Sequence, residues 1–106
     1  MTDSGKRATR GSRTGRPIMV LFDVLSQRWV LRILWELRGE RLNFRALRSR
    51  CEEVSPTVLN QRLKVLRELS LVDHDDQGYG LSVWGEELGE QLMSLSGFAD
   101  RWAKAR

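Results

Sequence analysis

Four polar residues lie close together in the stretch VSPTVLNQRLKVLRELSLV, residues 54–72. They are Thr57, Asn60, Gln61 and Lys64. On a helix that turns about 100° per residue, they fall roughly opposite an apolar face made by Leu59, Leu63 and Leu66. The Asn and Gln amides can pair with the major-groove edge of adenine, and the Lys ammonium can reach guanine or a phosphate. An ordinary solvated helix face has the same composition, so this feature alone leaves both interpretations open.

Residues that could hold DNA phosphates come just before this helix. Ser55 can cap its N-terminus and Pro56 suits its first position, so a phosphate could also bind at the helix N-terminus. A shorter helix expected at about 44–51 carries Arg45 and Arg48. Two helices joined by a tight turn and followed by a hairpin are the order of a winged helix-turn-helix. We therefore expect Arg45, Arg48 and Ser55 at phosphates, and the polar residues of the next helix toward bases.

Positive charge is unevenly distributed along the 106 residues. Residues 1–17 hold five Lys or Arg and one Asp, which accounts for the whole net charge of +4. The rest of the chain sums to zero, but residues 28–67 carry ten basic and four acidic groups, whereas 68–106 carry three basic and eight acidic groups. This asymmetry favours contact between the middle of the chain and a polyanion such as nucleic acid.

Composition predicts one domain over residues 17–106, preceded by a disordered basic tail over 1–16. An arginine of the tail, such as Arg13 or Arg16, could enter a DNA minor groove. Helical spacing and cap residues predict helices at about 18–25, 28–38, 44–51, 55–69 and 83–104, with a hairpin around Gln77-Gly78 before the last helix. The expected fold class is mainly α (α+β): a winged helix-turn-helix with a two-stranded wing, flanked by N- and C-terminal dimerisation helices.

The first and last helices carry more apolar surface than one chain can cover. A monomer would expose a patch larger than the few hundred Å² that soluble proteins tolerate. We therefore expect a two-fold homodimer, with its two recognition helices about one DNA turn, ~34 Å, apart. The expected interface residues are Ile18, Met19, Leu21, Phe22, Leu95, Phe98 and Trp102, with Val24 counted in the same apolar surface.

Four motifs in sequence order resemble the HxlR-type winged-helix transcriptional regulators, a family related to the MarR group. The motifs are VLSQRWVLRILWEL, NFRALRSRC, VSPTVLNQRLKVLRELSLV and YGLSVWGEEL, and the resemblance covers about residues 17–104. The matching positions are Arg28-Trp29; Phe44 and Leu47; Ser55, Leu59, Gln61, Arg62, Leu63 and Leu66; and Tyr79, Leu81, Ser82 and Gly85. No single motif is specific, but four in the right order and spacing are. The resemblance implies a transcriptional regulator that binds double-stranded DNA.

Four positions or segments depart from the family pattern. Many members carry a cysteine just before the first helix, used in some as a redox sensor, where this chain has Arg16. Cys51 takes a position that the family fills with an aliphatic residue, and we interpret it as a small buried hydrophobe rather than a sensor. The predicted wing holds three aspartates within 73–76, which would repel a phosphate backbone, so the wing either avoids DNA or contacts it only at the Tyr79 side. Ser70 replaces a usual glycine, at little cost if the preceding helix ends without a left-handed residue.

Composition also excludes several classes of function. The chain has one cysteine and one histidine, Cys51 and His74, so disulfide frameworks and Cys–His metal sites are excluded and no cofactor is expected. His74 has no nucleophile or metal partner at a spacing that would support catalysis, so an enzyme is not expected. Charges interrupt the apolar region 18–37 and no apolar leader begins the chain, so we expect a cytoplasmic protein without a membrane span. A ligand pocket lined by tryptophans stays an open alternative.

Two functions from different classes fit these observations. The first is a sequence-specific DNA-binding transcriptional regulator that acts as a homodimer, with a recognition helix at about 55–69 in the major groove. The second is a winged-helix protein–protein adaptor with a vestigial DNA face. The acidic wing favours the adaptor, while the polar residues of 57–64 and the basic segment 28–67 favour DNA. The sequence identifies no operator, no regulated gene and no small-molecule effector.

Overall fold

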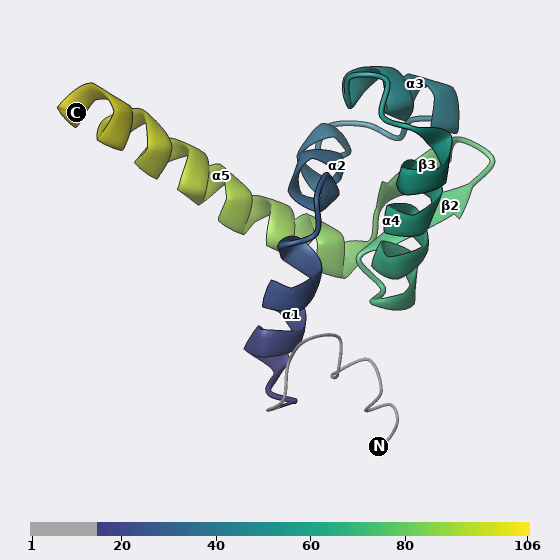
Figure 1. Cartoon of the computed structure of the whole chain (residues 1–106), viewed down its shortest axis with the longest axis horizontal. Coiled ribbons are helices and arrows are strands. Elements are labelled where there is room, and N and C mark those ends of the chain that lie inside the picture. The colour runs from purple at the N-terminus through teal and green to yellow at the C-terminus, as the bar shows by residue number, and fades with distance from the viewer. Residues whose placement is uncertain (1–14) are drawn as a thin grey trace.

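The computed structural model describes residues 15–106, which form five helices and a two-stranded antiparallel sheet (Figure 1). In chain order the elements are α1 (Pro17–Leu25), α2 (Val30–Glu36), α3 (Phe44–Arg50), α4 (Pro56–Glu68), β2 (Val72–Asp75), β3 (Gly78–Leu81) and α5 (Val83–Ala105). The predicted mainly α winged helix-turn-helix is confirmed. The tail predicted over 1–16 lies outside the described residues except for its last two positions, so its predicted disorder stays a prediction.

One apolar core joins α2, α3, α4 and the base of the wing. The three leucines predicted for the inner face of α4, Leu59, Leu63 and Leu66, are each at most 2% exposed. Burial of a leucine side chain favours folding by about 2 kcal/mol, so this face determines which side of α4 points outward. The other fully buried large side chains are Val24, Val30, Ile33, Leu34, Leu47 and Cys51.

The turn between α1 and α2 extends further than predicted, so the second helix does not start at residue 28. Trp29 has a φ of 79°, in the left-handed region, and α2 begins only at Val30. A bulky residue in this conformation is strained, and packing of the half-buried Trp29 side chain against the core offsets the strain. From α4, Arg62 Nε donates a hydrogen bond of 2.8 Å to the carbonyl oxygen of Arg28. The turn is thereby joined to α4.

Three helices begin at the cap residues that the sequence predicts. Asn43, Ser55 and Ser82 precede α3, α4 and α5, and each side-chain oxygen accepts a hydrogen bond from the backbone N–H three residues later. Pro56 occupies the first position of α4. A cap of this kind contributes about 1 kcal/mol, so the start of α4 is determined locally.

The wing is a hairpin whose turn lies one residue earlier than the predicted Gln77-Gly78. Asp75 pairs with Gly78, which leaves Asp76 and Gln77 as the two turn residues. Gly78 has a φ of 110°, and a Cβ there would lie 2.5 Å from the backbone oxygen of Leu42. Glycine is therefore required at position 78, because the Leu42 backbone lies against β3 here and forms an isolated bridge with Tyr79.

The end of α4 also differs from expectation, because Ser70 is left-handed with a φ of 61°. The Ser70 N–H donates to the carbonyl of Arg67 at 3.0 Å, and the Leu71 N–H donates to the carbonyl of Leu66 at 2.9 Å. This is the Schellman pattern, in which a glycine avoids the Cβ clash of the left-handed region. Ser70 is consequently a site of local strain.

The last helix, α5, leaves the body of the domain. It packs against α2 and β3, and its C-terminal part projects away from the other elements (Figure 1). α1 also extends from the body, and the two helices diverge from a common region near the start of α5 (Figure 1). Both helices therefore leave apolar side chains outside the core.

Candidate nucleic-acid interface

The outer face of α4 carries polar side chains that have no partners within the part of the chain that the structure describes. All four predicted residues, Thr57, Asn60, Gln61 and Lys64, are exposed. Within residues 15–106, none of their side chains makes a hydrogen bond or an ion pair. An amide side chain offers both donors and an acceptor, as pairing with a base edge requires. These groups remain available to a ligand.

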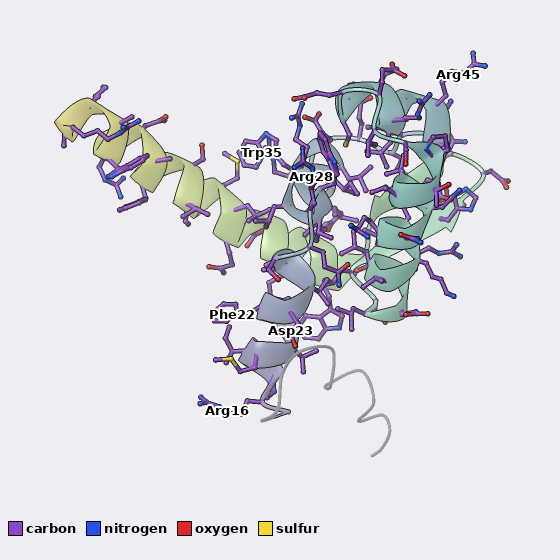
Figure 2. The ribbon with its side chains drawn as sticks, viewed as in Figure 1. Arg16, Phe22, Asp23, Arg28, Trp35 and Arg45 are labelled. Carbon is purple, nitrogen blue, oxygen red and sulfur yellow. The ribbon has the colours of Figure 1, made fainter. Side chains whose placement is uncertain are left out.

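The two arginines predicted to hold phosphates have different surroundings. Arg45 is exposed, makes no hydrogen bond or ion pair within the described residues, and projects from the outer edge of α3 (Figure 2). Arg48 Nε instead donates to the carbonyl oxygen of Val54 at 2.7 Å. Its other nitrogens lie 3.4 Å from the carbonyl and 3.3 Å from the carboxylate of Glu53. Arg45 faces solvent, whereas Arg48 holds the turn between α3 and α4.

That turn contains two consecutive left-handed residues that are not glycine. Glu52 and Glu53 have φ values of 58° and 59°. Each such residue costs roughly 1–2 kcal/mol relative to ordinary backbone. Contacts from α3 hold the conformation, since Ser49 Oγ donates to the Glu53 carboxylate at 3.0 Å beside the bonds from Arg48. The angle at which α4 leaves α3 therefore depends on side-chain contacts within the turn.

Arg32 of α2 braces the same turn from the other side. Its nitrogens lie 3.2 Å from the Glu52 carboxylate and 2.7 Å from the carbonyl oxygen of Arg50. A third contact of 2.8 Å joins Arg32 to Glu36. The hydrogen bond to Glu36 is the main cause of the raised pKa of Arg32, so its charge is retained. Three elements thus converge on the turn before α4.

Much of the basic segment 28–67 is neutralised by these and similar contacts. Of its ten basic residues, four pair with carboxylates: Arg32, Arg41, Arg48 and Arg50. Arg62 is bonded to a backbone carbonyl, and Arg38 lies over the Trp35 ring. Arg45, Lys64 and Arg67 have no hydrogen bond or ion pair within the described residues. The same holds for the side chain of Arg28, which lies over the Trp29 ring in the turn before α2. The positive surface is therefore narrower than the charge count indicates, and three of these four cations lie on α3 and α4.

The wing carries its acidic charge in a partly neutralised form. Arg41 pairs with both Asp73 and Asp75, and also donates to the carbonyl oxygen of Gly78 at 2.9 Å. The hydrogen bond to Asp73 is the main cause of the raised pKa of Arg41. Asp76, at the turn, makes no ion pair within the described residues. The expected repulsion of a phosphate backbone is thus concentrated at the tip of the wing.

A groove of about 480 Å³ separates α4 from β3. Its lining residues are Asn60, Leu63, Lys64, Arg67, Glu68 and Tyr79. Arg67 was not among the predicted contacts, and Tyr79 was named only as the side of the wing that is open to DNA. Arg67 lies three residues after Lys64, on the same helix face, so helical spacing alone could have identified it. Tyr79 could not be found in this way, because only the fold brings β3 beside α4.

The predicted interface residues of α1 and α5 are largely exposed. Phe22, Leu95, Phe98 and Trp102 are each 51–55% exposed and Ile18 is 40% exposed, whereas Met19 and Leu21 are half-buried. Figure 2 shows Phe22 extending from α1 toward the side on which α5 projects. Val24 does not belong to this surface, since it is 2% exposed within the core. A groove of about 430 Å³ between α2 and α5, lined by Leu31, Trp35, Leu92, Leu95 and Ala99 among others, adds to the apolar surface.

Residues 15–106 contain no cluster of three or more His, Cys, Asp or Glu side chains arranged to hold a metal ion. No helix in this range is long and apolar enough to cross a membrane. Cys51 is fully buried, and burial raises the pKa of its thiol against an opposing effect of Arg32. The chemistry that the described surface offers is hydrogen bonding and charge on α3 and α4.

Comparison with known proteins agrees with this architecture. The model of a family described as HxlR-like helix-turn-helix matches residues 24–106. Among solved structures, the quinone-bound YodB of B. subtilis is similar, with a TM-score of 0.72 and 25% sequence identity over 81% of this chain and 98% of that chain. No protein among the curated sequences matches the chain.

Proposed function

The chain belongs to the HxlR-like helix-turn-helix family of DNA-binding transcription regulators, and from this premise we propose that it binds a specific double-stranded DNA sequence as a homodimer. In this proposal α4 lies in the major groove, with Thr57, Asn60 and Gln61 toward the bases. Arg45 and Ser55 bind phosphates, Ser55 partly through the N-terminus of α4.

The observation that carries the proposal is the contrast between the two sides of α4. Its inner face is fully buried, while the outer face presents Asn60 and Gln61 with unused amide groups. In the neighbouring turn, by contrast, the Arg48 side chain is paired with the Val54 carbonyl and the Glu53 carboxylate. A row of unpaired amides on a helix held this firmly is suited to reading base edges.

Arg48 has a different role in this proposal from the phosphate contact expected of it. Its guanidinium is engaged by Val54 and Glu53, so it supports binding by fixing the orientation of α4. Lys64 has no such engagement, and its ammonium serves a base or a phosphate.

The homodimer is supported by the apolar surface that α1 and α5 leave outside the core. A second copy that covers Phe22, Phe98 and Trp102 removes the exposed patch and sets the two α4 helices at a fixed separation. A separation of ~34 Å corresponds to one turn of DNA and implies a palindromic site. The expected cytoplasmic location stays part of this proposal, and a small-molecule effector stays an open alternative with no ligand identified.

The rival function, a protein–protein adaptor, draws support from the unpaired Asp76 at the tip of the wing. The other two wing aspartates, Asp73 and Asp75, are paired with Arg41. This pairing weakens the argument that the acidic wing repels DNA. The adaptor also gives no reason for unpaired amides on α4. We therefore favour the DNA-binding function.

The test is selection of binding sites from a random duplex pool, followed by titration of selected and scrambled duplexes across a salt series. The expected result is a palindromic sequence bound at least tenfold more tightly than its scramble, with steep salt dependence for both. Sedimentation at micromolar concentration measures the oligomeric state and is expected to show a dimer. Equal affinity for selected and scrambled duplexes, or a stable monomer, contradicts the corresponding part of the proposal.

A further inference from the structure

We propose that the groove between α4 and β3 binds one phosphodiester of the DNA backbone, with Lys64 and Arg67 as its cations and the Tyr79 hydroxyl as a hydrogen-bond donor. This inference rests on the proposed function and adds to it a site that joins the recognition helix to the wing.

The α4 wall of the groove is formed by residues at successive helical turns. Asn60, Lys64 and Arg67 follow each other at spacings of four and three, so they lie on one side of α4 above the buried Leu63. β3 supplies the opposite wall through Tyr79. With a volume of about 480 Å³, the groove has room for a phosphate group together with part of the adjoining sugars.

The charge of the lining favours an anion. Lys64 and Arg67 have no ion pair within the described residues, so neither is neutralised by the fold. Glu68 is the one carboxylate in the lining, which leaves an excess of one positive charge in the groove. Asp73 and Asp75 of the wing could have added negative charge to that of Glu68, but both are paired with Arg41.

Tyr79 is held in place by neighbours that leave its hydroxyl unused. Its backbone exchanges hydrogen bonds of 2.8 and 2.9 Å with Leu42, and the His74 ring lies against it with centroids 4.3 Å apart. The hydroxyl makes no hydrogen bond within residues 15–106. A donor that is fixed in position before binding loses little conformational entropy when a phosphate arrives.

The place of the groove also fits a backbone phosphate better than a base. It lies beside the polar face of α4 that points to the major groove, between that face and the wing. With α4 in the major groove as proposed, one DNA backbone borders the helix on each side, and the side next to the wing is the side of this groove. A phosphate contact there fixes the register of α4 on the duplex without reading sequence.

The test combines single neutral phosphates with single substitutions. Duplexes of the selected site carry one methylphosphonate at each backbone position in turn and are titrated with wild type, Arg67→Ala and Tyr79→Phe. We expect a methylphosphonate at one position per half-site to weaken wild-type binding about tenfold, and the same change to have little effect on Arg67→Ala. Arg67→Ala should also lower the salt slope by about one, whereas the neutral Tyr79→Phe should weaken binding severalfold with the slope unchanged.

Lys104→Ala is the matched control, because it removes one positive charge from the exposed end of α5 and should leave the methylphosphonate pattern of wild type intact. Tyr79→Phe keeps the ring that packs on His74, so loss of folding is not expected to intervene. If every methylphosphonate penalty is the same in Arg67→Ala as in wild type, the phosphate site is overturned while DNA binding stands. If wild type fails to bind any duplex, the proposed function itself is wrong.

Discussion

The turn before α4 and the outer face of α4 use polar side chains in opposite ways. In the turn, Arg48 and Arg32 bond to backbone carbonyls and to Glu52 and Glu53, and two left-handed residues are held in a strained conformation. On the outer face, by contrast, the amides have no partner within the described chain. The turn determines where α4 points, and the face determines what it can bind. The position of an arginine relative to its partners, and not its residue type, separates an arginine held by the fold from one that faces solvent.

The largest expected effect on stability comes from removing the Arg48 side chain from the turn before α4. Arg48→Ala leaves the carbonyl of Val54 without its charged donor and releases Glu53, so we expect a loss of about 1.5–3 kcal/mol in the free energy of unfolding. Urea unfolding measures this loss, and Arg45→Ala is the matched control, expected within about 0.5 kcal/mol of wild type. An Arg48→Ala protein as stable as Arg45→Ala would show that the turn does not depend on this side chain.

Substitution on the outer face of α4 should weaken DNA binding and leave stability nearly unchanged. Gln61→Ala is expected to cost ~1–3 kcal/mol in binding of the selected site, with non-specific binding nearly unchanged, because an amide that reads a base is lost. The free energy of unfolding should stay the same or rise slightly, since alanine has the higher helix propensity. Titration of selected and scrambled duplexes gives the two affinities. A solvated surface would instead leave both affinities at the wild-type value.

Cys51 lies at the start of the turn before α4, and substituting it tests whether DNA binding responds to oxidants. Burial raises the pKa of its thiol, so the reactive thiolate is suppressed and peroxide should not change DNA binding. Cys51→Ser should lower stability by about 1–3 kcal/mol through a buried hydroxyl. Because the folded pKa is raised, stability should also fall as pH rises above the thiol's ordinary value of about 8.5, and Cys51→Ala should lose this dependence. Peroxide-dependent loss of binding that disappears in Cys51→Ala would contradict this interpretation.

The smallest expected effect lies at the other end of α4. Ser70→Gly removes the Cβ penalty of a left-handed residue, partly offset by the greater freedom of glycine in the unfolded chain, so we expect a gain of about 0.5–1 kcal/mol. Ser70→Ala keeps the Cβ and should show no gain, which makes it the control. Thermal unfolding of both variants decides between strain and a neutral position.

The sequence predicted those parts of the fold that depend on local signals. Asn43, Ser55 and Ser82 cap the predicted helices, and the leucine face of α4 is buried as expected. The left-handed conformation of Trp29 could not be predicted in this way, because its side chain packs against the core and nothing in local spacing marks it. Ser70 differs, because it ends α4 in a local Schellman pattern at a position where the family pattern has glycine.

The candidate site was predicted only where it depends on local spacing along one helix. The polar face of α4 follows from helical periodicity, so its exposure was predicted. Whether an arginine is free depends on residues that are distant in sequence, as when Arg41 meets Asp73 and Asp75. Tyr79 reaches the groove through strand pairing, which the spacing within α4 does not contain.

Within residues 15–106 the polar side chains on the outer face of α4 have no partners, and this has a consequence for evolution. Substitutions at exposed positions without bonds change stability by no more than about 0.5 kcal/mol, so Thr57, Asn60 and Gln61 can be exchanged while the scaffold persists. With the base contacts proposed above, the chain can therefore acquire a new recognition sequence through a series of folded intermediates. Change in the turn has no such path, because the residues that hold it depend on one another.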